Sequence, residues 1–182
     1  MTTPTTPTTP TTPVPDDKDW TWVLERPCPD CGFDASAITG ADVAGQLRTA
    51  VATLRSAVLA PGSDRRPQPD VWSALEYGCH VRDACIVFGT RLASMRHVDD
   101  PQFANWDQDQ TALAQRYWEQ DPVKVADELS VEGERIAAGF ASVADDEWQR
   151  PGRRSNGSVF TVDTLARYLL HDVVHHVHDV VG

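Results

Sequence analysis

Apolar residues recur at helical spacing over most of the chain after residue 38. Between residues 39 and 60 they repeat every three or four positions, as on one face of an amphipathic helix, at Val43, Leu47, Val51, Leu54 and Val58. Thr39 and Asp42 have the spacing of a capping box, and Pro61-Gly62 would end the segment. The pattern predicts a first helix over residues 39–60.

Three more long helices are predicted further along. The second would be capped by Asp70 and extend to about His97, with Leu75, Cys79, Ile86 and Leu92 among its apolar positions. The third starts at Asp121-Pro122, where a cap residue precedes proline, and extends to about Ala144. The last starts at Thr161 and continues to the end of the sequence.

The connections are less regular than the helices. Residues 111–119 are predicted to form a short helix, and Pro151-Gly152 with Asn156-Gly157 indicates a small hairpin within residues 145–160. Four helices of roughly 20 residues with no convincing strand pattern favour an all-α four-helix bundle over residues 39–182. Residues 16–38 are predicted to be an irregular arm on this bundle. The Thr-Thr-Pro repeats of residues 1–15 predict a disordered tail.

Composition narrows the classes of function. The chain has 182 residues with 27 acidic and 16 basic side chains, giving a formal net charge of −11. Such a charge disfavours binding to nucleic acid or to an anionic membrane surface. No apolar run approaches a membrane span, and MTTPTTPTTP does not have the pattern of a secretory signal. We therefore expect a cytoplasmic protein.

The last predicted helix is rich in residues that bind metal ions. His171 with His175 and Asp172 with His176 are each four residues apart, so each pair shares a helix face. On a helical wheel Asp172 and His176 lie at the edge of the apolar arc, whereas His171, His175 and His178 lie opposite its centre. The Asp172/His176 pair is therefore favoured as inward-facing ligands. The His171/His175 pair remains an alternative, as does a solvated histidine face without any ligand role.

A third ligand would have to come from another helix, and His80 on the second helix suits this role. Taken alone, a buried histidine such as His80 is more often a hydrogen-bonded core residue than a ligand. Together with Asp172 and His176, it would give three protein ligands and leave coordination positions open, as in catalytic metal sites.

These residues resemble a known superfamily. Trp72-Ser73-Ala74-Leu75-Glu76 leading to His80, and the final helix reading LLHDVVHHVHDV, are similar to the DinB/YfiT-like superfamily. The nearest type is the mycothiol-dependent maleylpyruvate isomerase, whose last helix reads acid-x-x-x-His-x-x-Asp-hydrophobic. Asp172, His176, Asp179 and Val180 fit this frame, with Asp172 where the type usually has Glu.

The resemblance implies both an architecture and a chemistry. It implies a four-helix bundle that binds a divalent metal, zinc or nickel, through His80, Asp172 and His176. It also implies a metal-activated low-molecular-weight thiol, mycothiol or bacillithiol, or a water, that attacks a small electrophilic substrate in a transferase or isomerase reaction. The alternatives are a non-catalytic metal-binding or stress-related module, and a homodimeric bundle without metal.

Other polar groups have weaker signals. Glu76 and Asp83 share a helix face with His80 and could orient its ring, or could be an ordinary polar edge. The basic cluster Arg150, Arg153 and Arg154 could hold a carboxylate of a substrate, although an exposed hairpin with solvated charges is favoured. The segment 105–109 could line a pocket or cap a helix.

The cysteines leave their role open. Cys28 and Cys31 form one CxxC turn with no second CxxC to complete a zinc ribbon. A redox pair, a labile disulfide, a metal site completed by histidines and an inert turn all remain alternatives. Cys79 and Cys85 are six residues apart and are predicted to lie on different sides of their helix.

Overall fold

The computed structural model describes residues 19–182, so the predicted tail at residues 1–15 lies outside the described residues. Its helices are α1 (Gly40–Val58), α2 (Ala74–His97), α3 (Gln108–Gln115), α4 (Pro122–Ala141) and α5 (Val162–Val181). Short 3-10 helices are η1 (Trp20–Leu24), η2 (Ala35–Ala37) and η3 (Tyr117–Glu119). The strands are β1 (Gln102–Phe103), β2 (Pro151–Arg154) and β3 (Val159–Thr161).

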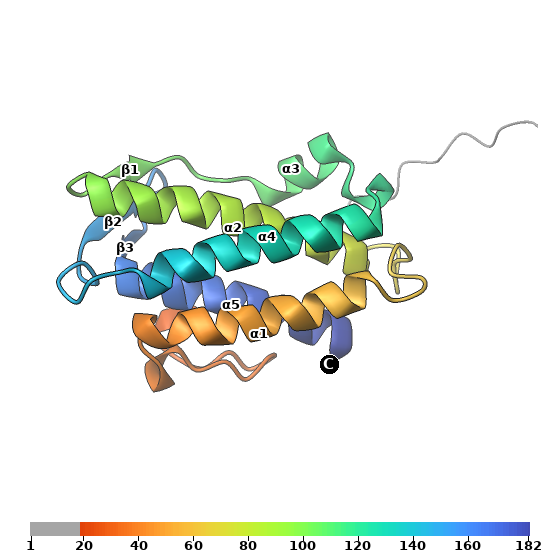
Figure 1. The fold of residues 1–182 in the computed structure, drawn as a ribbon, viewed down its shortest axis with the longest axis horizontal. Helices are drawn as coiled ribbons and strands as arrows, with labels where there is room; N and C mark the ends of the chain where they lie inside the picture. Colours follow the sequence, from red (N-terminus) through yellow and green to blue (C-terminus); the bar gives the residue numbers. More distant parts are fainter. Residues whose placement is uncertain (1–18) are drawn as a thin grey trace, which may run out of the picture.

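The four long helices α1, α2, α4 and α5 form a bundle (Figure 1), which confirms the predicted fold class. Both α1 and α2 pack chiefly against α4 and α5, so α1 and α2 lie diagonally across the bundle. Helices α1 and α5 run in one direction and α2 and α4 in the other (Figure 1). Each helix therefore has one parallel and one antiparallel neighbour, which differs from a simple up-down-up-down bundle.

Helix α1 forms where the apolar periodicity predicts it. Thr39 and Asp42 make both hydrogen bonds of the capping box, and the five predicted apolar positions are all buried. Its antiparallel neighbour α4 approaches very closely at Gly133, where a Cβ atom would lie 2.8 Å from a methyl group of Val51. Glycine at this position is therefore what allows the two backbones to come together.

Helix α2 begins later than predicted. Its cap is Ser73 rather than Asp70: the Ser73 hydroxyl accepts from the Glu76 N–H, and the Glu76 carboxylate accepts from the Ser73 N–H. This capping box satisfies two backbone donors at once, which a lone Asp70 cannot do. The expectation that Ile86 belongs to the apolar interior is also wrong, since 46% of its surface is exposed.

The predicted hairpin is present, and a third strand joins it. β2 pairs antiparallel with β3, and β1 adds to the other edge of β2 in parallel, with Gln102 opposite Arg153. The predicted short helix at 111–119 is instead two elements, α3 and η3, because Arg116 between them adopts a left-handed conformation with φ of 51°.

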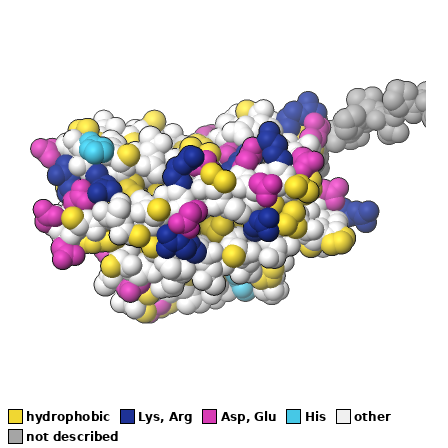
Figure 2. Space-filling model, viewed as in Figure 1, with side chains coloured by type: hydrophobic (Ala, Val, Ile, Leu, Met, Phe, Trp, Pro, Cys, Tyr) yellow, Lys and Arg dark blue, Asp and Glu magenta, His cyan; other side chains and the backbone are white. Residues whose placement is uncertain are grey.

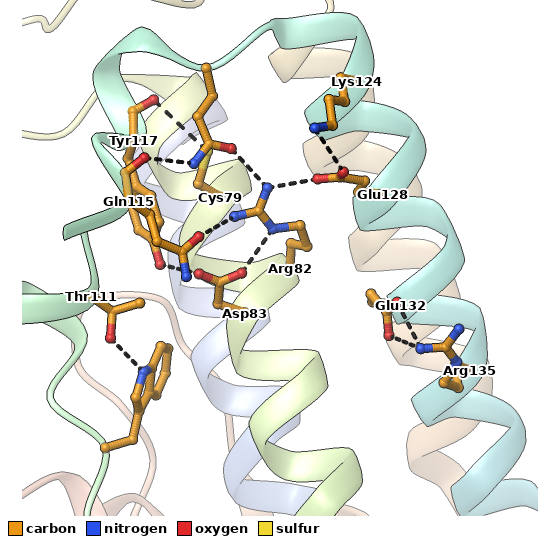
Figure 3. Close-up of polar contacts among 12 residues, drawn as sticks. Cys79, Arg82, Asp83, Thr111, Gln115, Tyr117, Lys124, Glu128, Glu132 and Arg135 are labelled. Carbon is orange, nitrogen blue, oxygen red and sulfur yellow. Dashed lines mark hydrogen bonds and ion pairs between the residues drawn. The ribbon is translucent and has the colours of Figure 1, made fainter. Parts of the chain in front are cut away.

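A polar network centred on the buried side chains of Arg82 and Asp83 fixes the segment between α3 and α4 against α2 (Figure 3). The Arg82 guanidinium donates to Asp83, Gln115, Gln120 and Glu128. The Tyr117 hydroxyl donates to the other oxygen of Asp83 at 2.6 Å. Because its charges and donors are partnered, this network can be buried without a large desolvation penalty.

The bundle surface in Figure 2 carries acidic and basic side chains interspersed with one another. Several of them form ion pairs between neighbouring helices, such as Arg48 of α1 with Glu134 of α4. Within residues 19–182, none of the helices has the combination of length and apolar character needed to cross a membrane.

Candidate metal centre

A pocket of about 770 Å³ lies where α5 meets the N-terminal arm, the loop before α3 and the hairpin. Its lining includes charged, aromatic and metal-ligating side chains: Trp20, Trp72, Arg91, Trp106, Arg154, Tyr168, Asp172, His176 and Asp179. Residues 105–109 also line it, and Asp107 caps α3 by accepting from the Gln110 N–H. Both roles considered for this segment are therefore present.

His80 lies beside the pocket, in the middle of α2. Only 1% of its surface is exposed. The Trp106 ring stacks on it with ring centres 5.4 Å apart, and the Trp72 ring lies 5.5 Å away on a tilt. The Trp106 indole N–H donates to Thr111 at 2.8 Å, which fixes this ring in its stacked position. The aromatic rings thus restrict the orientation of the imidazole.

The structure brings His80, Asp172 and His176 together. One potential ligand atom from each lies within 4.8 Å of the others. His80 Nε2 is 3.4 Å from one carboxylate oxygen of Asp172, and His176 Nε2 is 3.6 Å from the other. Nitrogen and oxygen ligands that share one tetrahedral zinc ion stand about 3.4 Å apart. The spacing therefore suits three ligands around one cation.

Three buried polar atoms of this cluster have no hydrogen-bond partner within the described part of the chain. Both ring nitrogens of His80 and the Asp172 oxygen nearest to it are buried without a hydrogen-bond partner. Buried polar groups are normally partnered, and each exception calls for an explanation. A divalent cation held by one nitrogen of His80 and by Asp172 would supply the missing partner, so the donor set fits a metal.

The charges in the cluster favour an ionised carboxylate. Burial raises the pKa of Asp172, but the adjacent His80 and His176 outweigh it and hold that pKa well below its ordinary value. Burial lowers the pKa of His176, but Asp172 and Asp179 reverse this effect and raise it to about 9. Because a ligating imidazole must be neutral, a cation at this position would displace a proton from His176.

Asp179 orients His176. One of its carboxylate oxygens lies 3.0 Å from His176 Nδ1, which leaves Nε2 directed at Asp172. Metal-binding histidines are usually held by a carboxylate in this way. The expectation that Glu76 or Asp83 orients His80 is wrong. Glu76 is bonded to Arg66 and the Ser73 N–H, and Asp83 to Arg82 and Tyr117.

The basic cluster predicted at residues 150–154 divides into separate roles. Arg150 donates to the Met95 carbonyl and contacts Asp99, and Arg153 pairs with Asp100, so both support the hairpin. Arg154 instead lines the pocket together with Arg91, a residue of α2 for which the sequence has no functional signal.

The two pocket arginines lack acidic partners among residues 19–182. The Arg91 guanidinium donates to the Ala104 carbonyl at 3.3 Å, and that of Arg154 to the Tyr168 hydroxyl at 3.3 Å. Burial, aided by the charge of Arg154, lowers the pKa of Arg91 to about 10. The pocket therefore holds two guanidinium groups without an ion-pair partner in the described chain, alongside aspartates such as Asp19, Asp107 and Asp172 on its lining.

The face of α5 that carries His171 and His175 is not exposed, contrary to the helical-wheel interpretation. The arm at residues 19–38 covers it, so that His171 is only 4% exposed and lies against Trp20 and Phe33. His178, the third member of that group, is exposed. The wheel places side chains correctly around α5 but contains no information about the arm.

The comparisons with known proteins agree with this architecture. Residues 46–180 match the DinB superfamily, and because this is most of the chain, the protein belongs to that superfamily. None of the curated proteins compared gave a significant match. Among solved structures, YfiT from Bacillus subtilis superposes with a TM-score of 0.68 at 17% identity, covering 78% of this chain and 83% of that one. It is described as a probable metal-dependent hydrolase with an unusual four-helix bundle topology. At this identity, the likeness shows the fold alone.

Proposed function

We propose that this member of the DinB superfamily is a divalent-metal-dependent enzyme acting on a small electrophilic substrate that carries a carboxylate. The observation that supports the proposal is the convergence of His80, Asp172 and His176 at the pocket, with unsatisfied buried atoms between them. Two imidazoles and a carboxylate suit zinc or nickel. When bound, such an ion lowers the pKa of a coordinated thiol or water and makes a nucleophile at neutral pH.

The placement of the three ligands favours an enzyme over a non-catalytic metal-binding module. Asp172 and His176 line the pocket, and three protein ligands leave coordination positions open. A module that only stores or senses a metal needs no such space beside it. The nucleophile would be mycothiol, bacillithiol or water, and the reaction a thiol transfer, an isomerisation or a hydrolysis.

The remaining pocket residues have definable roles in this proposal. Arg91 and Arg154 would bind a carboxylate of the substrate or of the thiol, because planar guanidinium groups pair well with carboxylates. Trp72 and Trp106 cover His80 and exclude water from its ring. Asp179 keeps His176 in the orientation that presents Nε2 to Asp172.

The test combines metal analysis with turnover. The purified wild type and the His80→Ala and His176→Ala variants would be analysed for zinc and nickel. They would then be assayed with mycothiol or bacillithiol, using maleylpyruvate for isomerisation and a fluorogenic bimane for thiol transfer. We expect both variants to lose one metal ion per chain and all metal-dependent turnover. His178→Ala, an exposed change on the same helix, is the matched control and should retain both.

Two results would contradict the proposal. Equal metal content in the wild type and His80→Ala would contradict the proposed metal site. Unchanged turnover in His80→Ala would contradict the proposed metal-dependent reaction. An Arg154→Gln variant adds a separate readout. We expect it to raise KM for maleylpyruvate at least tenfold and to leave metal content unchanged, because Arg154 has no ligand role.

A further inference from the structure

The CxxC turn of the N-terminal arm meets the second histidine pair of α5. Cys28, Cys31, His171 and His175 each place one potential ligand atom within 4.8 Å of the other three. We propose that these four residues bind a structural zinc ion that fastens the arm to α5. Its ligands are distinct from those of the pocket site, although His171 and His175 also border the pocket. The proposal does not depend on the proposed enzymatic function.

The chemistry of the donor set favours zinc. Two thiolates and two imidazoles form the Cys₂His₂ set typical of structural zinc sites, with C-x-x-C and H-x-x-x-H spacing. The Cys28 Sγ atom lies 3.6 Å from His175 Nδ1. A tetrahedral zinc with bonds of about 2.3 Å to sulfur and 2.05 Å to nitrogen separates these atoms by about 3.6 Å. The separation in the structure therefore equals that of two ligands on one ion.

The CxxC turn is shaped to present both sulfurs. The Gly32 N–H donates to the Cys28 carbonyl at 2.9 Å, and the Cys28 N–H donates to the Phe33 carbonyl at 2.8 Å. Gly32 has a φ of +74°, a conformation that glycine adopts without strain. These contacts close the turn, so the two sulfurs are held near each other before any ion binds.

An independent observation comes from the histidine side. His171 is 4% exposed, and its Nε2 atom is buried without a hydrogen-bond partner. Cys28 is also buried, and both cysteines are free thiols rather than a disulfide. An unpartnered polar nitrogen beside two free sulfurs is the arrangement expected where a cation completes the contacts. Four protein donors fill a tetrahedral shell, so this ion would have no open position for catalysis.

The ion would also shape the pocket wall. The Trp20 ring lies 5.7 Å from that of His171 and 5.2 Å from that of His175, and Trp20 lines the pocket. The arm is also held by a bond from Arg167 to the Ala35 carbonyl at 2.9 Å and by apolar packing on the core. The side chains that pack there are Trp20, Trp22, Val23, Leu24, Phe33, Ala35 and Ile38. Fastening the arm at Cys28 and Cys31 would thus keep Trp20 over the pocket.

Metal stoichiometry and X-ray absorption test the proposal. The protein as purified with zinc should contain two ions per chain, and its zinc spectrum should include sulfur neighbours at about 2.3 Å. Cys28→Ser/Cys31→Ser should keep one ion and lose the sulfur signal. The matched control is Cys79→Ala/Cys85→Ala, which removes two buried thiols elsewhere and should retain both ions. His80→Ala should lose only the ion without sulfur ligands.

Hydrogen exchange supplies a second readout that does not need the double variant to fold. Removal of zinc by a chelator should increase amide exchange in residues 20–37 at least tenfold, with exchange in α4 unchanged. The single change Cys31→Ser, at a half-buried position, should give the same increase without chelator.

Three results would overturn the proposal. The first is a zinc spectrum without sulfur neighbours in the wild type. The second is equal zinc content in the wild type and Cys28→Ser/Cys31→Ser. The third is exchange in residues 20–37 that does not respond to chelation. Failure of the proposed pocket site would be distinguishable from failure of this proposal. In that case the wild type would still contain one ion, and this ion would have sulfur ligands.

Discussion

Replacing Asp179 by Asn tests how the pocket site is built, because Asp179 is not among the three proposed ligands. Its carboxylate oxygen lies 3.0 Å from His176 Nδ1. Asparagine keeps the size of the side chain but removes the negative charge that favours a proton on Nδ1. With Nδ1 less firmly protonated, His176 would present Nε2 to a metal less often and as a weaker base.

The expected magnitude follows from the contact. Changing a carboxylate that supports a ligating histidine typically lowers metal affinity by about 10- to 100-fold, or about 1.4 to 2.7 kcal/mol. The Asp179 side chain is 26% exposed, so water can replace part of the lost interaction. We therefore expect a loss of about tenfold, near the lower limit of that range. Asp172→Asn, which weakens a proposed ligand itself, should lower the metal affinity further than Asp179→Asn does.

The assay is a zinc titration against a chromogenic chelator. Carrying it out in the Cys28→Ser/Cys31→Ser background isolates the pocket site from the proposed sulfur site. In the otherwise unchanged protein the sulfur-ligated ion should be retained, because Asp179 is 3.8 Å from His175 Nε2, too far for a hydrogen bond. His178→Ala is the control. An Asp179→Asn affinity equal to that of the parent would refute the role assigned to Asp179.

The remaining predictions concern the stability of the fold and the N-terminal arm. Each variant is compared with the wild type at the same zinc concentration. Leu129→Ala, at a position with 0% exposure, should lower the free energy of unfolding by about 2–5 kcal/mol in urea denaturation, whereas a loss below about 1 kcal/mol would contradict its place in the core. Tyr117→Phe should lower the free energy of unfolding by about 1–3 kcal/mol in the same assay, because buried Asp83 loses a hydrogen-bond donor at 2.6 Å. An unchanged free energy of unfolding would show that this bond contributes nothing to stability. Gly32→Ala should strain the CxxC turn by about 1–2 kcal/mol, since φ is +74° there. Its readout is faster amide exchange in residues 20–37, and unaltered exchange would argue against the turn's role.

The long helices could be predicted from sequence because their signals are local. The apolar positions of α1 repeat within one element, and Thr39 with Asp42 marks its start, so the prediction needs no knowledge of other segments. The start of α2 was misplaced because Asp70 and Ser73 are both good caps. Only the reciprocal bonds between Ser73 and Glu76 decide between them.

Features that depend on contacts between distant segments were less predictable. β1 has two residues, and its pairing with β2 joins positions about fifty residues apart, so no periodicity could show it. Arg91 has no sequence signal as a pocket residue. Its role becomes apparent only when Arg154 lies beside it in the same pocket. The clustering of His80 with Asp172 and His176 was predictable because the wheel of α5 places the latter two at the edge of its apolar face, and His80 is the suitable histidine on another long helix.

In the sequence, the two candidate ligand pairs of α5 compete for one role because a helix in isolation has a single inward face. In the folded chain α5 is covered on two sides, by α2 near Asp172 and His176 and by the arm near His171 and His175. The pairs are offset by one residue, which rotates them about 100° apart around the helix and directs them to these different neighbours. Each pair therefore meets its own third partner, His80 in one case and the CxxC turn in the other. If both sets bind an ion, the same two turns of α5 are held from two sides. The arm would then influence the pocket through Trp20 and through the rigidity of the helix that carries Asp172 and His176.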